Sequence, residues 1–215
     1  MLTERVAFIS GGTGALGSAV AERLSAEGSL VYVSYLQEKE LLQLPAGLQR
    51  SVKPFKADMT NESQVNELYE SILANSSRIE IVINAVGGFL PRKCLTEVSV
   101  EEWDRMMNVN LKSTFLSTRE ALRRMVGQSY GRIVNISAMI GVRPLPERIP
   151  YAVSKASVSL LTELVAQEVK GTGITINAIA PSIIATPANI TSMPGEDMSQ
   201  WVTPAQIADI ISYLC

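Results

Sequence analysis

The sequence contains no histidine, and this absence removes several kinds of chemistry. It excludes serine–histidine and cysteine–histidine nucleophile pairs and most zinc sites. We therefore predict no metal centre, and proton transfer must come from tyrosine, lysine, aspartate, glutamate or water. The only two cysteines, Cys94 and Cys215, lie far apart in the chain and have no nearby ligand partners. We expect packed or partly buried thiols there rather than a redox centre.

The chain also lacks a charge excess and a long apolar run. It carries 19 basic and 21 acidic residues, and a net charge of -2 gives no reason to expect binding to nucleic acid or to an anionic membrane surface. No apolar stretch approaches the roughly 18 residues that span a bilayer. The N-terminus shows no basic region with a cleavage site. These absences favour a soluble, cytoplasmic protein without nucleic-acid or membrane partners.

Short β-branched runs alternate with helical patterns along the whole chain. Near-continuous apolar runs predict strands, buried on both faces of a parallel sheet, at residues 5–10, 30–35, 51–55, 80–84, 131–137 and 173–179. Apolar residues at helical spacing predict helices at residues 15–27, 61–76, 100–126, 151–170 and 204–214. The fold class is therefore α/β: a doubly wound parallel sheet of six strands in three layers, forming a single domain over residues 1–215.

Between residues 181 and 203 both patterns are lost. The stretch holds three prolines and Gly195 and shows no regular period. A segment this long without a regular element is usually a functional lid or a mobile loop, which we expect at residues 182–203. Thr203 is then a plausible N-cap for the last helix, with Pro204 at its first position.

A glycine-rich turn follows the first predicted strand and opens the first predicted helix. It reads Ser10-Gly11-Gly12-Thr13-Gly14-Ala15-Leu16-Gly17 and contains the pattern Gly-x-Gly-x-x-Gly. Glycine permits a tight turn and a close approach of a diphosphate, whose charge is attracted by the N–H groups at the helix start. The context indicates dinucleotide binding by this turn. A P-loop is disfavoured because no Lys-Ser or Lys-Thr pair follows Gly17.

The end of the second predicted strand bears on the choice of dinucleotide. Dinucleotide folds often place an acid there to bond the adenosine ribose. This strand ends in Val33-Ser34-Tyr35-Leu36, without an acid. The absence leaves room for a 2′-phosphate, although no arginine is present to bind it and Lys39 is the nearest cation. We therefore favour NADP over NAD.

Tyr151 and Lys155 open the fourth long predicted helix in the pattern Tyr-x-x-x-Lys. Residues four apart lie on one helical face, so the phenol and the ammonium can share a pocket. With a reference pKa of about 10, tyrosine is a poor base at neutral pH. A nearby lysine and an oxidised nicotinamide ring would lower that pKa. The pair is a candidate for proton transfer, although the same spacing is common on surface helices.

Taken in order, these motifs resemble the short-chain dehydrogenase/reductase family over essentially the whole chain. The matching pieces are the glycine turn, Asp58, Asn84-Ala85-Val86-Gly87, Asn110, the fifth strand, the Tyr151/Lys155 pair, and Pro181 with Thr186. The resemblance implies a Rossmann-like NAD(P)-binding domain. It also implies an oxidoreductase that transfers hydride between NADP or NAD and a small carbonyl- or imine-type substrate.

The resemblance implies a role for each matching residue. Tyr151 would protonate the substrate, Lys155 would bond the nicotinamide ribose and lower the tyrosine pKa, and Asn110 would hold a water that links Lys155 to solvent. Asp58 would contact the adenine, Asn84 and Gly87 would wall the adenosine side, and Thr186 would bond the carboxamide. The other expected cofactor contacts are Tyr35, Met59, Ala85 and Pro181. Simpler alternatives are that Asn110 satisfies a helix kink, Asp58 caps a helix and Thr186 stabilises a turn.

The pattern departs from the family at Ala138, where the family usually has a catalytic serine. The neighbouring Ser137 should not substitute, because adjacent strand residues point to opposite faces. Losing one donor to a developing oxyanion typically costs on the order of 10²–10³ in rate. Three interpretations follow. The substrate could need only the tyrosine for its reduction, the enzyme could be slow, or the protein could bind the cofactor without turnover. The combination of Ala138, residues 87–89 and Trp201 is similar to a branch related to dihydropteridine reductases, in which this serine is also alanine, and favours the first interpretation.

Three further expectations concern assembly, the chain end and rival functions. The resemblance implies a homotetramer or homodimer through helices 100–126 and 151–170, unless their apolar residues all face the sheet; the candidates are Leu111, Phe115, Leu122, Val158 and Leu161. The family's seventh strand is missing after residue 215, which would leave the sixth strand exposed. The main rival function is a cofactor-binding regulatory or scaffold protein without catalysis. A methyltransferase with a similar glycine turn would leave the Tyr151/Lys155 pair unexplained.

Overall fold

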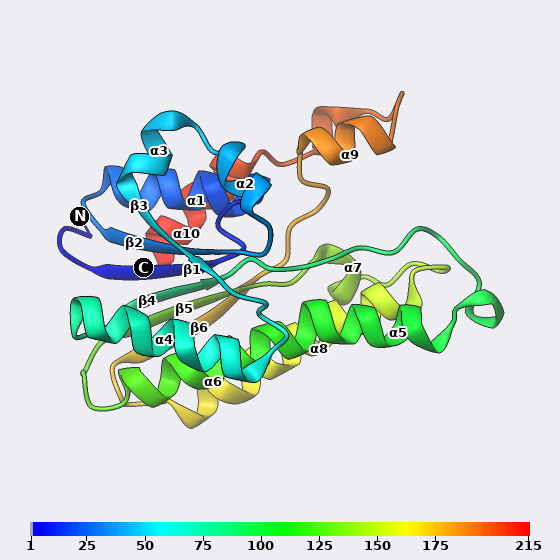
Figure 1. Ribbon diagram of the computed structural model, residues 1–215. Coiled ribbons are helices and arrows are strands. Elements are labelled where there is room, and N and C mark those ends of the chain that lie inside the picture. The colour runs from blue at the N-terminus through cyan, green and yellow to red at the C-terminus, as the bar shows by residue number, and fades with distance from the viewer. Residues whose placement is uncertain (1) are drawn as a thin grey trace.

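The computed structural model describes residues 2–215, in which six parallel strands form one sheet in the order β3-β2-β1-β4-β5-β6 (Figure 1). The predicted doubly wound α/β fold is confirmed, and each strand begins and ends within one residue of its prediction. The strands are β1 (Val6–Ser10), β2 (Leu30–Tyr35), β3 (Val52–Lys56), β4 (Ile81–Asn84), β5 (Gly131–Ile136) and β6 (Ile174–Ile179).

Helices cover both faces of the sheet and give the three predicted layers. One face carries α1 (Ala15–Ala26) and α10 (Pro204–Leu214), with the short α2 (Glu38–Leu42) and α3 (Ala46–Ser51) before β3. The other carries α4 (Glu62–Ser76), α6 (Ser113–Met125) and α8 (Ile149–Glu168) (Figure 1). The remaining elements are α5 (Val100–Met106), α7 (Met139–Val142), α9 (Pro187–Ser192) and the 3-10 turns η1 (Leu95–Glu97) and η3 (Met198–Gln200).

Strand alternation divides the core into two halves. In β1, Ala7 and Ile9 pack with Leu24 of α1, whereas Phe8 packs on the opposite face with Leu68 of α4. Successive strand residues point to opposite faces, so a strand buried on both sides must be apolar throughout. This requirement explains why continuous apolar runs located the inner strands β1 and β4. The prediction of burial on both faces is wrong for β3, which lies at the edge of the sheet and is largely exposed.

The predicted helix over residues 100–126 is wrong in its middle. A π-helical segment, η2 (Met107–Lys112), separates α5 from α6. A π-turn adds a residue to the turn and shifts the side chains that follow around the helix axis, and such bulges are common at functional sites. Asn110, one of the candidate site residues, lies inside this segment.

The expectation of no regular element between residues 181 and 203 is also wrong. Thr186 caps α9 by accepting a hydrogen bond from Asn189 N at 3.2 Å, and Pro187 takes the first helical position. A bridge between Ile184 and Val202 closes the segment at its base. The predicted cap of α10 by Thr203 is confirmed, since its hydroxyl accepts from Gln206 N at 3.2 Å.

The two cysteines differ from each other in environment. Cys215 is partly buried, as expected, and burial raises the pKa of its thiol to about 12. Cys94 is exposed, which contradicts the expected packed thiol, because it precedes η1 in a loop on the surface. Within residues 2–215 no cluster of metal-ligating side chains forms, and no helix is long and apolar enough to cross a bilayer.

Gly17→Ala should destabilise the fold, because a Cβ at residue 17 would lie 2.2 Å from the Gly11 carbonyl oxygen. We expect urea denaturation to show a loss of about 1–3 kcal/mol in the free energy of unfolding. Gly47→Ala is the matched control: its Cβ would meet nothing within 4 Å, and alanine raises helix stability by up to about 1 kcal/mol. Equal stability of the two variants would contradict this packing.

Candidate active site

The glycine turn between β1 and α1 is built by close contacts that exclude side chains. Gly11 has a φ of +66°, a left-handed conformation that favours glycine. A Cβ at Gly12 would lie 2.5 Å from the Val33 side chain, and one at Gly17 would meet the Gly11 carbonyl. At Gly14 the nearest atom to a Cβ would be 3.4 Å away. Glycines 11, 12 and 17 therefore shape the turn, and Gly14 leaves its surface open.

The first turn of α1 fits an anionic group. Gly14 is the N-cap and provides no side-chain hydrogen bond to the helix start. Gly14 and Ala15 are exposed, while Thr13 and Leu16 are partly buried. Free N–H groups at a helix N-terminus attract phosphate, so the turn is suited to a dinucleotide diphosphate.

Ser10 joins this turn to the end of β4. Its buried hydroxyl accepts hydrogen bonds from Ala85 N at 3.1 Å and Val86 N at 3.4 Å. β1 and β4 are neighbours in the sheet although α1, β2, β3 and α4 separate them in sequence. The crevice at this change of direction is where open α/β sheets bind ligands. Ser10 and Ala85 hold the two sides of the crevice together.

Gly87 lies where the Asn110 and Lys155 side chains converge. A Cβ on Gly87 would be 3.0 Å from Asn110 Oδ1 and 3.2 Å from Lys155 Nζ. The next residue, Gly88, is clamped by Asn110, whose Oδ1 accepts from Gly88 N at 2.8 Å and whose Nδ2 donates to Gly88 O at 3.1 Å. The backbone after β4 therefore passes directly over the predicted catalytic group.

Asn110 connects three parts of the chain from its fully buried position in η2. Besides the Gly88 backbone, its Nδ2 donates to Ser154 Oγ at 3.0 Å, and Ser154 Oγ donates to the Tyr151 carbonyl at 2.8 Å. The π-helical turn presents the amide to both neighbours. These contacts position the loop after β4 and the start of α8. They agree with the simpler alternative that Asn110 satisfies an irregularity in its own helix.

Lys155 is buried on the sheet side of α8. Its Nζ donates to the Ile136 carbonyl at 2.8 Å, and 5% of the residue is exposed. Burial disfavours the ammonium and lowers the pKa of Lys155 to about 8. This lysine therefore changes charge at a pH where ordinary lysines stay protonated.

Tyr151 lies one turn before Lys155 in a partly buried environment. Its ring meets Phe89 edge to face, with centroids 5.9 Å apart and an interplanar angle of 87°. Burial raises the pKa of Tyr151, and the cation that opposes this shift is Arg148. Lys155 was predicted to lower this pKa, but in the structure its ammonium donates to the Ile136 carbonyl.

No hydroxyl replaces the serine that the family usually has before the tyrosine. Ala138 is buried at the start of α7. The Ser137 hydroxyl donates to Lys155 O at 2.8 Å and contacts Ser159 Oγ at 2.8 Å. Ser137 therefore faces α8, in agreement with the prediction that it does not substitute.

The Asn84 side chain belongs to a buried polar network between the sheet and its helices. Its Nδ2 donates to Asn135 Oδ1 at 2.8 Å and Thr118 Oγ1 at 3.1 Å. Asn135 in turn donates to Thr162 Oγ1 at 2.9 Å. The side-chain nitrogen of Asn84 thus joins β4 to α6 and β5. The Asn84 backbone is therefore the part that could form the predicted wall of the adenosine site.

The remaining candidates lie at the same carboxyl edge of the sheet. Asp58 accepts from Thr60 N at 2.9 Å and is not the cap of α4, since Asn61 fills that position. Met59 is buried, and Pro181 accepts from Met139 N at 2.8 Å. Tyr35 donates to Glu38 at 3.2 Å. Thr186 caps α9, as its simpler alternative proposed.

Glu40 is a further candidate for a cofactor contact, and it was not predicted from the sequence. Its carboxylate accepts hydrogen bonds from Thr13 Oγ1 at 2.9 Å, Leu36 N at 3.2 Å and Gln37 N at 3.2 Å. It therefore sits between the glycine turn and the end of β2, where dinucleotide folds bind the adenosine ribose. The carboxylate comes from α2 instead of from β2. The capping-box spacing of Gln37 and Glu40 is the sequence pattern that could have indicated its position.

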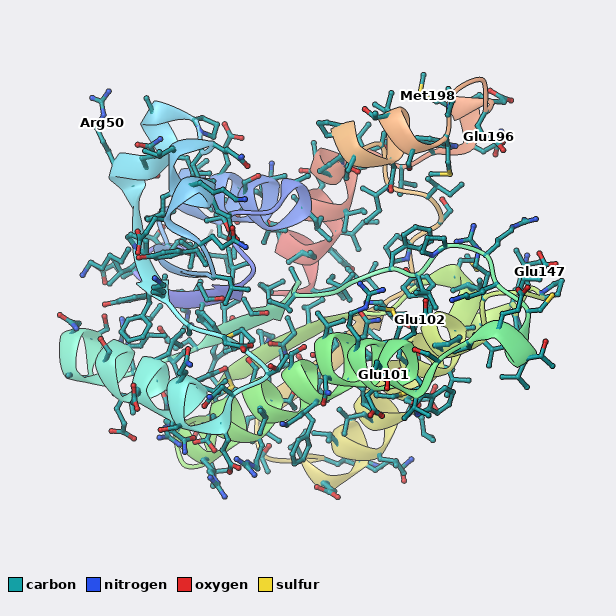
Figure 2. All side chains as sticks on the ribbon, turned by 45° about the vertical axis from the view of Figure 1, so that its right-hand side comes forward. Arg50, Glu101, Glu102, Glu147, Glu196 and Met198 are labelled. Carbon is teal, nitrogen blue, oxygen red and sulfur yellow. The ribbon has the colours of Figure 1, made fainter. Side chains whose placement is uncertain are left out.

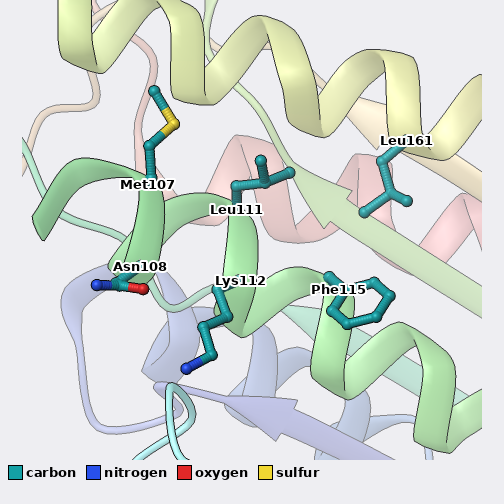
Figure 3. A pocket seen from close by; sticks show the side chains of 6 residues that line it. All are labelled: Met107, Asn108, Leu111, Lys112, Phe115 and Leu161. Atoms are coloured by element: carbon teal, nitrogen blue, oxygen red, sulfur yellow. The ribbon is translucent and has the colours of Figure 1, made fainter. Parts of the chain in front are cut away.

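A separate groove runs between α8 and the α5–α6 helix. It has a volume of about 390 Å³ and is lined by Met107, Asn108, Leu111, Lys112, Phe115 and Leu161. Figure 3 shows Leu161 pointing from α8 toward the helix that carries Leu111 and Phe115. Val158 is fully buried. Leu122 is partly buried and packs against the core between the sheet and α4 and α6. The five predicted interface residues are thus divided between the groove and the core.

Comparisons with known proteins give consistent matches across this chain. The family profile described as short chain dehydrogenase matches residues 5–197. An uncharacterised oxidoreductase of Staphylococcus aureus (strain USA300) is 31% identical over 214 residues, which cover 99% of this chain and 91% of that protein.

Two solved structures share the fold over nearly the whole chain. ElxO with NADP bound has a TM-score of 0.91 and 29% identity, covering 99% of this chain and 91% of that one. NAD+-bound xylitol dehydrogenase has a TM-score of 0.88 and 23% identity, covering 99% and 92%; this likeness concerns the fold.

The buried lysine predicts a pH-dependent stability. Its pKa is about 8 in the folded chain against an ordinary 10.5, so the unfolded chain binds more protons between these values and stability rises with pH. From about pH 7.5 to about pH 9.5, the native chain should gain about 2 kcal/mol relative to Lys155→Met in denaturant titrations. The exposed Lys112→Met is the control and should follow the native curve. Parallel curves for the native chain and Lys155→Met would contradict the burial effect.

Proposed function

Because this chain belongs to the short-chain dehydrogenase family, we propose that it is an NAD(P)-dependent oxidoreductase acting on a small carbonyl- or imine-type substrate, with Tyr151 as proton donor and acceptor. The observation that carries this proposal is the convergence of Gly87, Asn110 and Lys155 one turn from Tyr151, beside the glycine turn. The match to the family profile over residues 5–197 supports the same activity.

The chain's own residues divide the work between binding and proton transfer. The glycine turn would hold the diphosphate, and the Gly87 backbone would line the crevice beside the nicotinamide. When bound, the nicotinamide supplies or accepts the hydride. Burial keeps the Tyr151 phenol protonated and therefore ready to donate in the direction of reduction. The Lys155 ammonium would resupply that proton from solvent through a water, and the Asn110 amide would hold this water in place.

Ala138 removes a hydrogen-bond donor from this arrangement, and the substrate must compensate. A conjugated imine ring, as in the dihydropteridine reductases that the sequence resembles, would need only the tyrosine. Alternatively, a second group on the protein would hold the substrate in place of the serine. Residues 182–203, which begin directly after Pro181, are suited to cover the substrate. The rival function is a binding protein without turnover, which Ala138 favours.

Tyr151→Phe should lower NAD(P)H-dependent reduction by at least about 100-fold, because the phenol proton is lost, and adding Lys155→Ala should abolish it. Cofactor binding, measured by NAD(P)H fluorescence, should persist in Tyr151→Phe. Tyr213→Phe, on the exposed face of α10, is the matched control and should retain full activity. Undiminished reduction by the double variant would exclude the assigned roles, and a native chain that binds cofactor without reducing any carbonyl or pterin-like compound would favour the rival function.

We further propose that Glu40 makes the chain prefer NAD(H). The sequence favoured NADP because β2 ends without an acid, and ElxO binds NADP. In this chain, however, the Glu40 carboxylate accepts hydrogen bonds from Thr13 Oγ1 in the glycine turn and from Leu36 N after β2. A ribose hydroxyl can donate to that carboxylate, whereas a 2′-phosphate would be repelled by it.

Glu40→Gln should shift the ratio of NADP+ to NAD+ affinity toward NADP+ by at least about tenfold, because removing like-charge repulsion between groups in contact is worth more than about 1.4 kcal/mol. Equilibrium dissociation constants from fluorescence titration give this ratio directly. Glu38→Gln, on the same helix but bonded to Tyr35, is the control. A native preference for NADP+, or an unchanged ratio in Glu40→Gln, would contradict the assignment.

We also propose a homodimer or homotetramer that uses the groove between α8 and the α5–α6 helix. Phe115, Leu160 and Leu164 are 42%, 57% and 52% exposed along these two helices. Apolar surface of this kind is stabilised when a second copy covers it.

A further inference from the structure

Arg148 is a partly buried cation at the start of α8, three residues before Tyr151. Its guanidinium stacks on the Phe89 ring, with Cζ 4.9 Å from the ring centroid. The other contact of that ring is the edge-to-face packing with Tyr151. The Arg148 guanidinium and the Tyr151 phenol therefore contact the same aromatic ring, which is itself 52% exposed.

The positive charge of Arg148 has no carboxylate partner. Across residues 2–215, no Asp or Glu oxygen comes within 4.0 Å of the Arg148 or Arg92 guanidinium, whereas the neighbouring Lys93 pairs with Glu102 at 2.8 Å. Glu147 is exposed, and Figure 2 shows it at the outer edge of the molecule. Burial and the nearby Arg92 both lower the pKa of Arg148, while Tyr151 and Glu147 oppose them.

Most hydrogen-bonding capacity of this guanidinium is also unused. A guanidinium has five N–H donors, and within the described residues the Leu90 carbonyl, 3.3 Å from Arg148 Nη1, is its protein acceptor. A partly buried charge whose donors have few protein acceptors is favoured when an anion pairs with it. The planar fork of arginine matches a carboxylate with two parallel hydrogen bonds.

We propose that Arg148 binds a carboxylate of the substrate and so positions the reducible carbonyl or imine against Tyr151. This inference rests on the proposed function and narrows the substrate class to small oxo acids, their imine counterparts and the corresponding reduced acids. The carboxylate takes no part in the redox change. It supplies the orientation that the missing hydroxyl at Ala138 would otherwise provide, because binding a remote group can align the reacting one.

Two hydrogen bonds fix the segment that carries Arg148. Lys93 N donates to the Glu147 carbonyl at 2.9 Å, and Arg148 itself reaches the Leu90 carbonyl. The loop after β4 and the segment before α8 therefore form one wall. Glu147 has left-handed backbone with a φ of 62°.

Equilibrium binding of two probes of equal shape tests the inference without turnover. With saturating NAD+ or NADP+, the native chain should bind benzoate at least about 30-fold more tightly than benzamide in calorimetric titrations, the ratio expected for a charged hydrogen-bonded pair. Arg148→Gln should abolish this preference, and Arg148→Lys should restore part of it. Arg143→Gln, an exposed arginine in the same segment, should leave it unchanged. Benzoate that binds no better than benzamide, absent binding included, overturns the proposal.

Kinetics separate this inference from the proposed function. Arg148→Gln should raise KM for phenylglyoxylate at least about 30-fold and leave KM for its methyl ester unchanged, since the ester carries no charge. A similar rise for both substrates would indicate a structural role and overturn the proposal. Failure of the proposed function has a different signature: the native chain would reduce no carbonyl compound, or Tyr151→Phe would retain reduction, whatever the benzoate preference.

Discussion

Parallel pairing of β1 with β4 is the constraint on which the site depends. The register sets Ser10 opposite Asn84, so the glycine turn after β1 and the Ala85–Gly88 backbone after β4 leave the sheet at the same edge. The glycine turn and Gly87 lie on these two exits, and the remaining candidates follow β2, β3, β5 and β6 at the same edge. The Ser10 hydroxyl and the Asn110 amide then fix the two exits to each other and to α8.

Burial sets the pKa values of the two candidate proton-transfer groups, Lys155 and Tyr151. The side chains of Lys155 and Tyr151 are both shielded from solvent, and this stabilises the neutral form of each. Burial therefore lowers the pKa of Lys155 and raises the pKa of Tyr151. The charge that opposes the rise in the pKa of Tyr151 is that of Arg148, which has no carboxylate within 4.0 Å among residues 2–215. An anionic substrate would compensate that charge, and the same contact would make up for the hydroxyl absent at Ala138.

The strands, the glycine turn and the Tyr151/Lys155 pair could be predicted from sequence because each has a local signal: continuous apolar runs, a Gly-x-Gly-x-x-Gly spacing and one helical turn. The π-helical segment could not, since it has no such local signal and its Asn110 is bonded to Gly88, a residue on another segment. Glu40 was missed because its carboxylate reaches the glycine turn and the end of β2 from α2 instead of from β2. The direction of the Asn84 amide and the stacking of Arg148 on Phe89 depend on packing between segments more than 50 residues apart.

A crystal structure of the chain with oxidised NAD(P)+ bound would test the central claim most directly. We expect electron density for the diphosphate at the N-terminus of α1 and for the nicotinamide beside Gly87, with the Tyr151 hydroxyl facing the ring. A dinucleotide bound elsewhere, or a Tyr151 hydroxyl directed away from the nicotinamide, would contradict the account.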